Sequence, residues 1–385
     1  MLDINYYRFA EEKAKNSLPS WLISKRYNLE IFEKEGFPVR LNNNQQLKQI
    51  FNTMQEDRFN IYMNELGGLS KDDLKIFINA LKKSIEFQIL FFPKSKTILP
   101  LDTLMAFFTI YKKIYSLNKD VTSILEIGPG SGFSPFFFDM FSSLKNYTYT
   151  DACESFYMLQ NHINHFLFKE NFFQHTIEDE QNDIYVLDEI SSYSNGGIEK
   201  DLYTKRKLKN SFKSNSYPWW KLNHLVEDQG TFDIVTSNAN LLEFSEGALN
   251  DYLSIIQKKL SENGLFFVHC PGYNLIRTFE YLVNKLIQFK FAIIFHAKWT
   301  QSYTCTKENK EIKKRFRVPN MIVVKEGHEL YDKFYGKTDI PELMLSGIKQ
   351  IDEVFLPNSD YYKGKIIYSK EDIKNILLND ENYTE

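Results

Sequence analysis

The pattern of hydrophobic and polar residues changes character about a third of the way along this chain. Residues 1–118 carry apolar side chains at helical spacing. The clearest stripe consists of Leu74, Phe77, Ile78, Leu81 and Ile85. Ser70 and Asp73 resemble a capping box at the start of that helix, and residues 101–117 predict another helix. The first 118 residues are therefore predicted to form a mostly helical region.

From residue 119 onward, short apolar runs alternate with amphipathic stretches. This order predicts an α/β fold with a Rossmann-like sheet of seven strands, in which five strand–helix alternations precede a closing hairpin. The predicted strands are 121–127, 147–151, 172–177, 232–238, 265–270, 289–296 and 319–324, with 184–187 as an alternative third strand. The polar stretch 191–216 is interpreted as a loop inside an insertion at about 181–221. Residues 119–326 then form the α/β domain, and residues 327–385 form a C-terminal extension.

A glycine-rich turn directly follows the first predicted strand. Residues 121–127 are almost all apolar, as in a strand buried on both faces of a parallel sheet. Glycines at alternate positions let a ligand approach the backbone closely. Ser134 and Pro135 then favour the start of a helix, whose N-terminus attracts negative charge. The dinucleotide fingerprint G-x-G-x-x-G does not fit, because Phe133 stands where its third glycine belongs.

The pattern Glu-x-Gly-x-Gly-x-Gly, which runs from Glu126 to Gly132, resembles the first motif of class I methyltransferases, which bind S-adenosylmethionine. The resemblance implies the class I methyltransferase fold for the predicted sheet. It also implies that Glu126 helps to hold the cationic methionine end of the cofactor. The turn residues that would admit its carboxylate and ribose are Gly128, Pro129, Gly130 and Gly132. The alternative is a glycine-rich turn in some other α/β protein.

Further polar residues fit the remaining parts of this cofactor. Asp151 ends the second predicted strand, 19 residues after Gly132, and an acid at that place accepts hydrogen bonds from both ribose hydroxyls. Alternatively, Asp151 could be the N-cap of the helix that follows this strand. Glu178 and Asp179 follow the third predicted strand, where adenine would be recognised. Asn238, at the end of the fourth strand, is also assigned to cofactor binding.

Three local segments are similar to the sugar O-methyltransferases found among bacterial surface-polysaccharide genes. They are residues 125–132, residues 150–157 with Gln160 and Asn161, and residues 218–221 with 238–243. The similarity covers roughly residues 100–325. It implies a sugar or glycan-precursor acceptor, with S-adenosylhomocysteine as the product. Where such relatives tend to carry a histidine after the fourth-strand asparagine, this chain has Ala239, so no base is carried over to that position.

Methyl transfer to a hydroxyl needs an oriented acceptor and a base that removes its proton. Glu243 lies just past the fourth strand, at the edge of the sheet where open α/β proteins bind ligands. His269 ends the fifth strand on the same edge. Glu243 is the first choice for the base and His269 the second, although each could equally make a structural hydrogen bond. His224 is a more remote candidate.

The aromatic pair Trp219 and Trp220, followed by Lys221, is a candidate substrate site. Aromatic faces suit the apolar faces of pyranose rings, but one of the two rings could simply fill the core. No group of residues has convincing metal-ligand spacing, since His162 and His165 share a helix face without a third ligand nearby. No metal is assigned, and a requirement for magnesium remains open.

Composition narrows the class of protein further. The 385 residues include 33 Phe and 23 Tyr, enough for a large aromatic core, and the net charge of -3 argues against nonspecific nucleic-acid binding. Three cysteines are too few for a disulfide framework. The sequence shows no hydrophobic signal region and no apolar run of about 18 residues, so we expect a cytoplasmic protein without a membrane span. Two alternatives to a sugar methyltransferase stay open: methylation of a small metabolite or a protein side chain, and a non-catalytic binding role. The sequence does not determine the oligomeric state.

Overall fold

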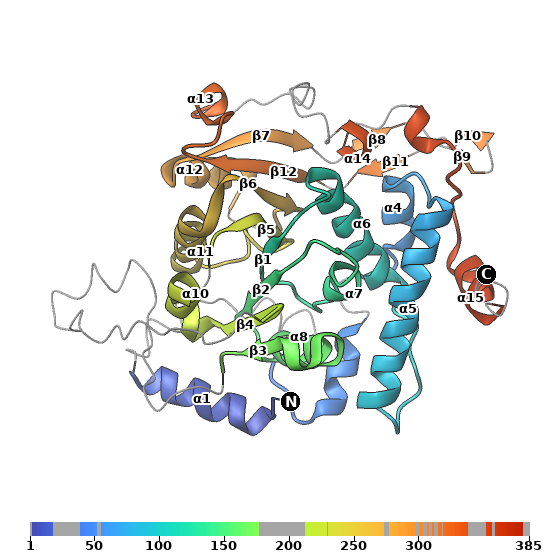
Figure 1. The fold of residues 1–385 in the computed structure, drawn as a ribbon, viewed down its shortest axis with the longest axis horizontal. Coiled ribbons are helices and arrows are strands. Elements are labelled where there is room, and N and C mark those ends of the chain that lie inside the picture. Colours follow the sequence, from blue (N-terminus) through green and yellow to red (C-terminus); the bar gives the residue numbers. More distant parts are fainter. Residues whose placement is uncertain are drawn as a thin grey trace.

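The structure is a computed structural model (Figure 1). It describes residues 2–17, 39–51, 55–176, 212–228, 230–272, 277–297, 300–302, 306–307, 310–311, 315–317, 319–337, 352–355 and 359–379.

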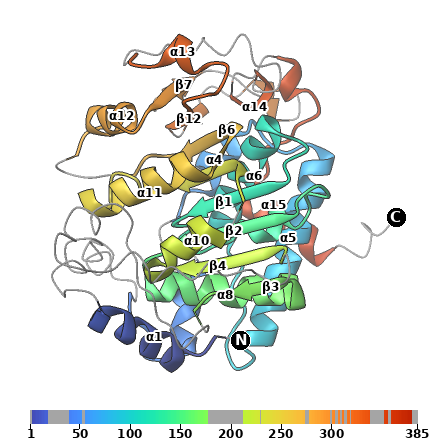
Figure 2. The same ribbon diagram turned by 60° about the vertical axis from the view of Figure 1, so that its left-hand side comes forward.

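A mixed sheet of eight strands forms the centre of the fold (Figure 2). Its order across the sheet is β3 (Phe172–Gln174), β4 (Ser214–Pro218), β2 (Asn146–Asp151), β1 (Ser123–Ile127), β5 (Phe232–Asn238), β6 (Leu260–His269), β12 (Asn320–Lys325) and β7 (Phe291–Ala297). Seven of these strands run in the same direction, and β12 runs opposite to them. The α/β class is as predicted, but the prediction of seven strands is wrong. The additional strand is β4.

The strand β4 lies in a segment that the sequence analysis interpreted as loop. It has the sequence Ser-Asn-Ser-Tyr-Pro and is buried throughout, although it lacks the apolar run expected of a central strand. Two of its hydroxyls donate hydrogen bonds to α8 (Glu154–Phe168), a helix that precedes β4 in the chain. Ser214 Oγ donates to Asn164 Oδ1 over 2.8 Å, and Ser216 Oγ donates to Asn161 Oδ1 over 3.1 Å. Because these hydrogen bonds satisfy its polar side chains, a polar strand is stable inside the sheet.

Helices cover both faces of the sheet (Figures 1 and 2). One face carries α10 (Leu222–Asp228), α11 (Glu246–Lys259) and α12 (Phe279–Gln288). The other carries α6 (Leu101–Leu117), α7 (Pro135–Phe138) and α8 (Glu154–Phe168), with α5 (Lys71–Phe91) packed on α6 and α7. Crossover connections between parallel strands are right-handed. The helices that connect strands on one side of β1 therefore cover one face of the sheet, and those that connect strands on the other side cover the opposite face.

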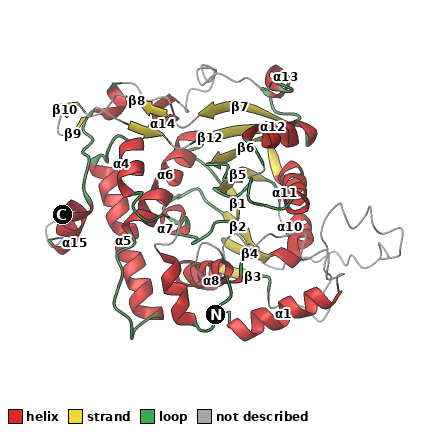
Figure 3. Cartoon of the chain, turned by 180° about the vertical axis from the view of Figure 1, so that it is seen from behind, coloured by secondary structure: helices red, strands yellow, loops and turns green. Residues whose placement is uncertain are grey.

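The N-terminal helical region packs beside the sheet (Figure 3). Besides α5 and α6 it contains α1 (Ile4–Ser17), the short helix η1 (Asn44–Phe51) and α4 (Phe59–Glu65). The predicted capping box at the start of α5 is confirmed, since Ser70 accepts from the Asp73 backbone while the Asp73 side chain accepts from Ser70. The helix α6 has the bounds predicted from the sequence.

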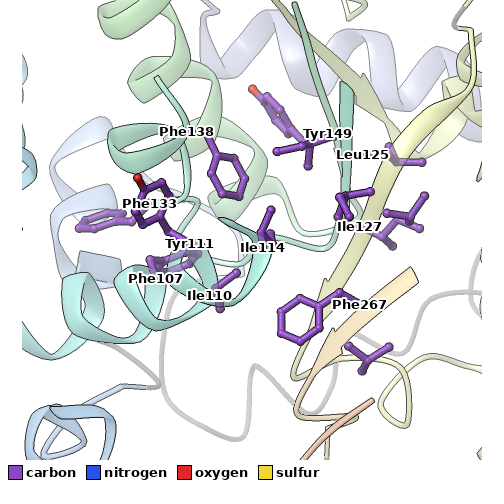
Figure 4. Packing of buried hydrophobic residues seen from close by; sticks show 14 of the residues in the cluster. Phe107, Ile110, Tyr111, Ile114, Leu125, Ile127, Phe133, Phe138, Tyr149 and Phe267 are labelled. Carbon is purple, nitrogen blue, oxygen red and sulfur yellow. The ribbon is translucent and has the colours of Figure 1, made fainter. Parts of the chain in front are cut away.

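Aromatic side chains fill the space between α6 and the sheet (Figure 4). The Phe133 ring, which directly follows the glycine turn, lies 6.1 Å from the ring of Phe107 and 5.3 Å from that of Phe51. All three rings are buried. The core therefore anchors the C-terminal end of the glycine turn against both η1 and α6.

Four short strands lie between β7 and β12 in the chain: β8 (Thr300–Ser302), β9 (Thr306–Lys307), β10 (Lys310–Glu311) and β11 (Arg315–Arg317). The helices α13 (Tyr331–Phe334), α14 (Asp352–Phe355) and α15 (Lys370–Leu378) follow β12. The short helices η2 (Lys169–Asn171), η4 (Trp219–Lys221) and η6 (Asp360–Tyr362) complete the described elements. The helix predicted near Ser369 is α15, and Ser369 forms a capping box with Asp372. None of the helices among the described residues is long and apolar enough to cross a membrane.

Candidate functional site

The carboxyl ends of β1 and β5 mark the point where the order of strands reverses. From β1 the chain adds β2 and β4 on one side, then crosses over to add β5 and β6 on the other. Open α/β sheets bind their ligands at such a point, outside the carboxyl ends of the strands. The glycine turn begins directly after Ile127, the last residue of β1. The topology therefore places that turn at the expected ligand site of the sheet.

The three glycines of the turn have backbone conformations that side chains disfavour. Their φ angles are +61° at Gly128, +60° at Gly130 and +68° at Gly132. A Cβ on Gly128 would come within 2.3 Å of Asn240 Nδ2, and a Cβ on Gly132 would come within 2.3 Å of Gln160 Cγ. The first and third glycines are therefore needed for close packing within the protein itself.

Gly130 serves a different purpose from its two neighbours. A Cβ on Gly130 would meet no heavy atom within 4 Å, and the residue is half-buried while Pro129 beside it is buried. A left-handed glycine that packs against nothing leaves the backbone open to a ligand. Gly130 is thus the position of the turn that a bound molecule can approach.

Asp151 ends β2 and lies beside this open position. Its Oδ1 accepts from the Cys153 backbone N–H over 2.9 Å, and its Oδ2 accepts from Gln160 Nε2 over 2.8 Å. Burial raises the pKa of Asp151 to about 6, although the Cys153 and Gln160 hydrogen bonds, and one from the Gly130 backbone, lower it in part. With a further hydrogen bond from the Ala152 backbone, four donors therefore align the carboxyl group beside the glycine turn.

Glu126 lies beneath the turn rather than at its surface. Its fully buried side chain accepts from Ser134 Oγ over 2.8 Å, from Tyr147 OH over 2.7 Å and from Asn238 Nδ2 over 3.3 Å. Burial raises its pKa to about 7, against the lowering by these three donors. The Glu126 carboxyl group therefore joins β1 to β2, β5 and α7.

The helix predicted after the turn is short, and Ser134 does not cap it. The helix α7 has only four residues, and the Ser134 side chain makes no capping hydrogen bond. Its hydroxyl is directed to Glu126 instead. A single turn of helix sums few peptide dipoles, so the expected attraction of α7 for negative charge carries little weight.

The ends of β5 and β6 are joined by an unusual backbone arrangement. Ala239 and Cys270 follow the two strands with φ angles of +60° and +65°, which cost energy for residues other than glycine. The Ala239 N–H donates to the Cys270 carbonyl over 2.8 Å. Asn240 Nδ2 then donates to the carbonyls of Ile127 and Gly128. These contacts fix the carboxyl ends of β1, β5 and β6 relative to one another.

His269, the second candidate base, ends β6 in a buried polar cluster. Its Nδ1 lies 3.3 Å from Lys113 Nζ of α6, and Lys113 forms a buried ion pair with Glu65 of α4. The ring of Tyr62 lies 5.9 Å from the His269 ring. Burial, followed by the charge of Lys113, holds the pKa of His269 well below its usual value. The ring is therefore neutral at neutral pH.

Glu243, the first candidate base, is half-buried in the segment between β5 and α11. Its backbone N–H donates to the Asn240 carbonyl over 2.9 Å. The pKa of Cys270 is raised, first by burial and in part by the negative charges of Glu243 and Glu65, while Arg58 acts in the opposite direction. Both candidate bases therefore lie around the carboxyl end of β6.

The residues assigned to the substrate are buried in the structure. Trp219 and Trp220 are 3% and 2% exposed, and the Trp220 ring packs edge-on against Tyr7 with 5.0 Å between centroids. Trp219 Nε1 donates to Glu11 Oε1 over 3.4 Å. Lys221 is also buried, and His224 is half-buried on α10. Both indole rings thus pack with α1, which is the core role that the sequence analysis left open.

Other candidates lie apart from the site or outside the described residues. His162 is buried, stacks on Phe91 with 5.7 Å between centroids, and lies 3.2 Å from the Leu2 carbonyl. Glu178 and Asp179 fall outside the described residues. Within the described ranges, no group of three or more His, Cys, Asp or Glu side chains is placed to hold a metal ion.

Several residues of the site were not predicted as such. Gln160 appears in a motif of the family resemblance but not among the expected ligands, and it links Asp151 to Gly130. Lys113 and Glu65 belong to helices of the first 118 residues, far in sequence from His269. No local pattern marks Lys113, since other polar residues of α6, such as Asp102 and Thr109, are buried as well.

No protein-family model and no curated protein matches the sequence. Solved structures do match. The chain is similar to a ribosomal-protein methylase from Lactobacillus delbrueckii (13% identity, TM-score 0.32, 56% of this chain and 76% of that chain). It is also similar to a TehB-like SAM-dependent methyltransferase from Corynebacterium glutamicum (11%, 0.31, 57% and 88%) and to an SAH-bound methyltransferase from Podospora anserina (12%, 0.30, 64% and 88%). At such low similarity, fold and function have to be argued from the strand order and residues of this chain.

Proposed function

We propose that this chain is an S-adenosylmethionine-dependent methyltransferase that methylates a sugar hydroxyl of a glycan or surface-polysaccharide precursor. One observation carries the methyltransferase part. The open, left-handed Gly130 and the aligned carboxyl group of Asp151 lie together at the reversal point of the sheet. An α/β protein uses that combination to receive a ribose and an adjoining polar group.

The residues present fit this cofactor. Gly130 leaves room at the backbone, and Asp151 has a carboxyl group that can accept from ribose hydroxyls. Gln160 Oε1 is buried, and the described residues include no hydrogen-bond partner for it, so it is a further acceptor beside Asp151. When bound, S-adenosylmethionine would supply an electrophilic methyl group on a cationic sulfur. The protein would bind and orient this group and exclude water from it.

For the acceptor, the protein has to position a hydroxyl and take its proton. Glu243 is the proposed base, because it is half-buried at the edge of the sheet where the acceptor would lie. Glu243 would take the proton of the acceptor hydroxyl, while Gly130 and Asp151 would hold S-adenosylmethionine, which would supply the methyl group and leave as S-adenosylhomocysteine. The choice of a sugar is supported by the resemblance of the three sequence segments.

Calorimetric titration with S-adenosylmethionine and S-adenosylhomocysteine tests the cofactor assignment. We expect both to bind wild type, and Asp151→Ala to weaken binding by about 1–3 kcal/mol, the scale of hydrogen bonds to a charged group. Absence of binding to folded wild type would exclude the function. Transfer of a labelled methyl group to nucleotide-sugars and glycan fragments, with metabolite and peptide pools beside them, then tests the acceptor. A protein that binds the cofactor and methylates none of these would be a binding protein.

A further inference from the structure

Three polar side chains form a row across the carboxyl edge of the sheet. In the strand register, His269 of β6 pairs with Asn238 of β5 on one side and with Asn320 of β12 on the other. Paired residues on neighbouring strands project to the same face of a sheet. That face is covered by α6, because His269 lies 3.3 Å from Lys113. The row is therefore enclosed between the sheet and the N-terminal helices, next to the cofactor turn.

The contact with Lys113 determines which nitrogen of His269 carries the hydrogen. A lysine ammonium group has three donors and no acceptor. Lys113 is buried and paired with the carboxylate of Glu65, which keeps it in the ammonium form. Because Lys113 donates to Nδ1, that nitrogen has to present its lone pair. In the neutral ring the hydrogen then resides on Nε2.

The Nε2–H group is left without a partner. His269 is 3% exposed, and the described residues include no hydrogen-bond partner for Nε2. A buried donor without a partner costs about 1–3 kcal/mol. Such a cost is removed when a ligand brings an acceptor to the same place.

We infer that His269 is a hydrogen-bond donor to the methyl acceptor, through Nε2–H, and that Lys113 and Glu65 are positioning residues that fix this tautomer. The inference rests on the proposed function and refines it. The group recognised is an uncharged oxygen with a free lone pair, such as a sugar hydroxyl or ring oxygen. His269 then orients the acceptor oxygen while Glu243 takes its proton.

A base role for His269 conflicts with this arrangement. A base needs a free lone pair, and the lone pair of the neutral ring is directed at Lys113. Protonation would create a second positive charge beside that ammonium group. Both the hydrogen bond and the charge of Lys113 thus favour a neutral donor over a proton acceptor.

Nitrogen NMR of protein labelled at its histidines tests the tautomer without any need for activity. His269 is assigned by the signal that disappears in His269→Gln. We expect a protonated Nε2 and an unprotonated Nδ1 at neutral pH. In the double variant Lys113→Met with Glu65→Leu, which removes both buried charges together, this preference should be lost. A protonated Nδ1 or a charged ring in wild type would overturn the inference.

Two variants at His269 then test the donor in catalysis. Gln places an amide N–H close to the position of Nε2, whereas Phe fills the space without a donor. We expect His269→Phe to lower kcat/KM for the acceptor by about 10- to 100-fold, the scale of one hydrogen bond, and His269→Gln to restore most of it. Equal and severe losses in both variants would indicate a base and overturn the donor role.

The cofactor provides the control for these experiments. Both His269 variants should bind S-adenosylmethionine as wild type does, since Gly130 and Asp151 are unchanged. If wild type neither binds the cofactor nor transfers a methyl group, the proposed function fails, and with it the acceptor role of His269. If wild type is active but His269 has the other tautomer, only the present inference fails.

Discussion

Gln160 donates a hydrogen bond from Nε2 to Asp151 Oδ2 over 2.8 Å. The same amide donates to the Gly130 carbonyl over 2.6 Å, so one side chain of α8 connects the carboxyl group at the end of β2 to the open glycine of the turn. The relationship explains why Gly132 has no side chain, since a Cβ there would collide with Gln160. Gln160 thus sets the distance between the two parts of the proposed cofactor site.

Gln160→Leu should therefore weaken S-adenosylmethionine binding by about 1–2 kcal/mol, or roughly tenfold, because Asp151 loses a donor and its alignment. Calorimetric titration measures the effect. Gln288→Leu is the control, since Gln288 is exposed at the end of α12. Equal affinities in the two variants would show that Asp151 is held without Gln160.

Gly130→Ala should weaken cofactor binding by more than its effect on stability explains. Its φ of +60° strains an alanine by about 1 kcal/mol, and the new methyl group enters the space left for the ligand. Gly336→Ala is a matched control, since Gly336 also has a positive φ, of +74°, and a Cβ there would meet nothing within 4 Å. Both variants should lose similar stability in urea unfolding, and only Gly130→Ala should lose affinity. Loss of affinity in both would indicate a general effect of strain.

Cofactor affinity should fall as the pH drops through about 6. Burial raises the pKa of Asp151 to about 6, so the free protein takes up a proton there, while ribose hydroxyls bind the ionised form. Affinity is then full above this pKa and falls up to tenfold per pH unit below it. Titrations between pH 8 and pH 5 measure the slope. Asp151→Asn should remove this pH dependence, because the other raised carboxyl group, that of Glu126, is fully buried beneath the turn and bonded to three donors. Parallel curves for wild type and variant would exclude Asp151 as the titrating group.

The buried carboxylate of Glu154 should contribute to stability by joining the N-terminal region to α8. It accepts from Arg8 over 2.8 Å and from Arg40 over 2.7 Å, and from the Leu41 backbone. Because both arginines are about 40% exposed, at 41% and 39%, we expect Glu154→Gln to cost about 1–3 kcal/mol rather than the full value of a buried pair. Urea unfolding measures the loss. Glu371→Gln, in an exposed pair with Lys374, should change stability by less than about 0.5 kcal/mol.

The pH dependence of this contribution has a definite sign. Burial raises the pKa of Glu154, but the hydrogen bonds from Arg8, Leu41 and Arg40 outweigh it, so the pKa is lowered. Stability from a lowered carboxyl pKa is complete above the ordinary value of 4.5 and is lost as the pH falls through the lower folded value. The difference in stability between wild type and Glu154→Gln should therefore shrink in acid. A constant difference from pH 7 to pH 3 would contradict the role of the carboxylate charge.

The sequence predicted those parts of the fold that depend on local patterns. β5 has the predicted bounds, because its apolar run is bounded by polar residues, and Ser70 and Ser369 mark true helix starts. β4 was missed, because its polar side chains are satisfied by Asn161 and Asn164 of α8, a partnership that no periodicity reveals. The same holds for Lys113, whose place beside His269 arises only when α6 packs on the sheet.

At the candidate site, the sequence predicted the glycine turn but not the contacts of the side chains around it. Glycines at alternate positions predicted the turn, because only glycine adopts such φ angles easily. The pattern could not show that Glu126 is enclosed by three donors, nor that both tryptophans are buried with α1. Those facts depend on residues up to 208 positions away, which come together only in the folded chain.

Glu243→Gln should lower turnover by about 10²-fold or more and leave cofactor affinity nearly unchanged. The amide keeps the size of the side chain but cannot take the hydroxyl proton, and a general base contributes at least that factor. Glu243 lies past β5 on the acceptor side, whereas Gly130 and Asp151 hold the cofactor, so the two effects should separate. Single-turnover methyl transfer to an acceptor found in the screen measures the chemical step. Glu246→Gln is the control, because Glu246 is exposed at the start of α11 and pairs with Lys285. If Glu243→Gln turned over as fast as wild type, Glu243 would not be the base. Because the lone pair of His269 is directed at Lys113, the hydroxyl proton would then have to pass to water.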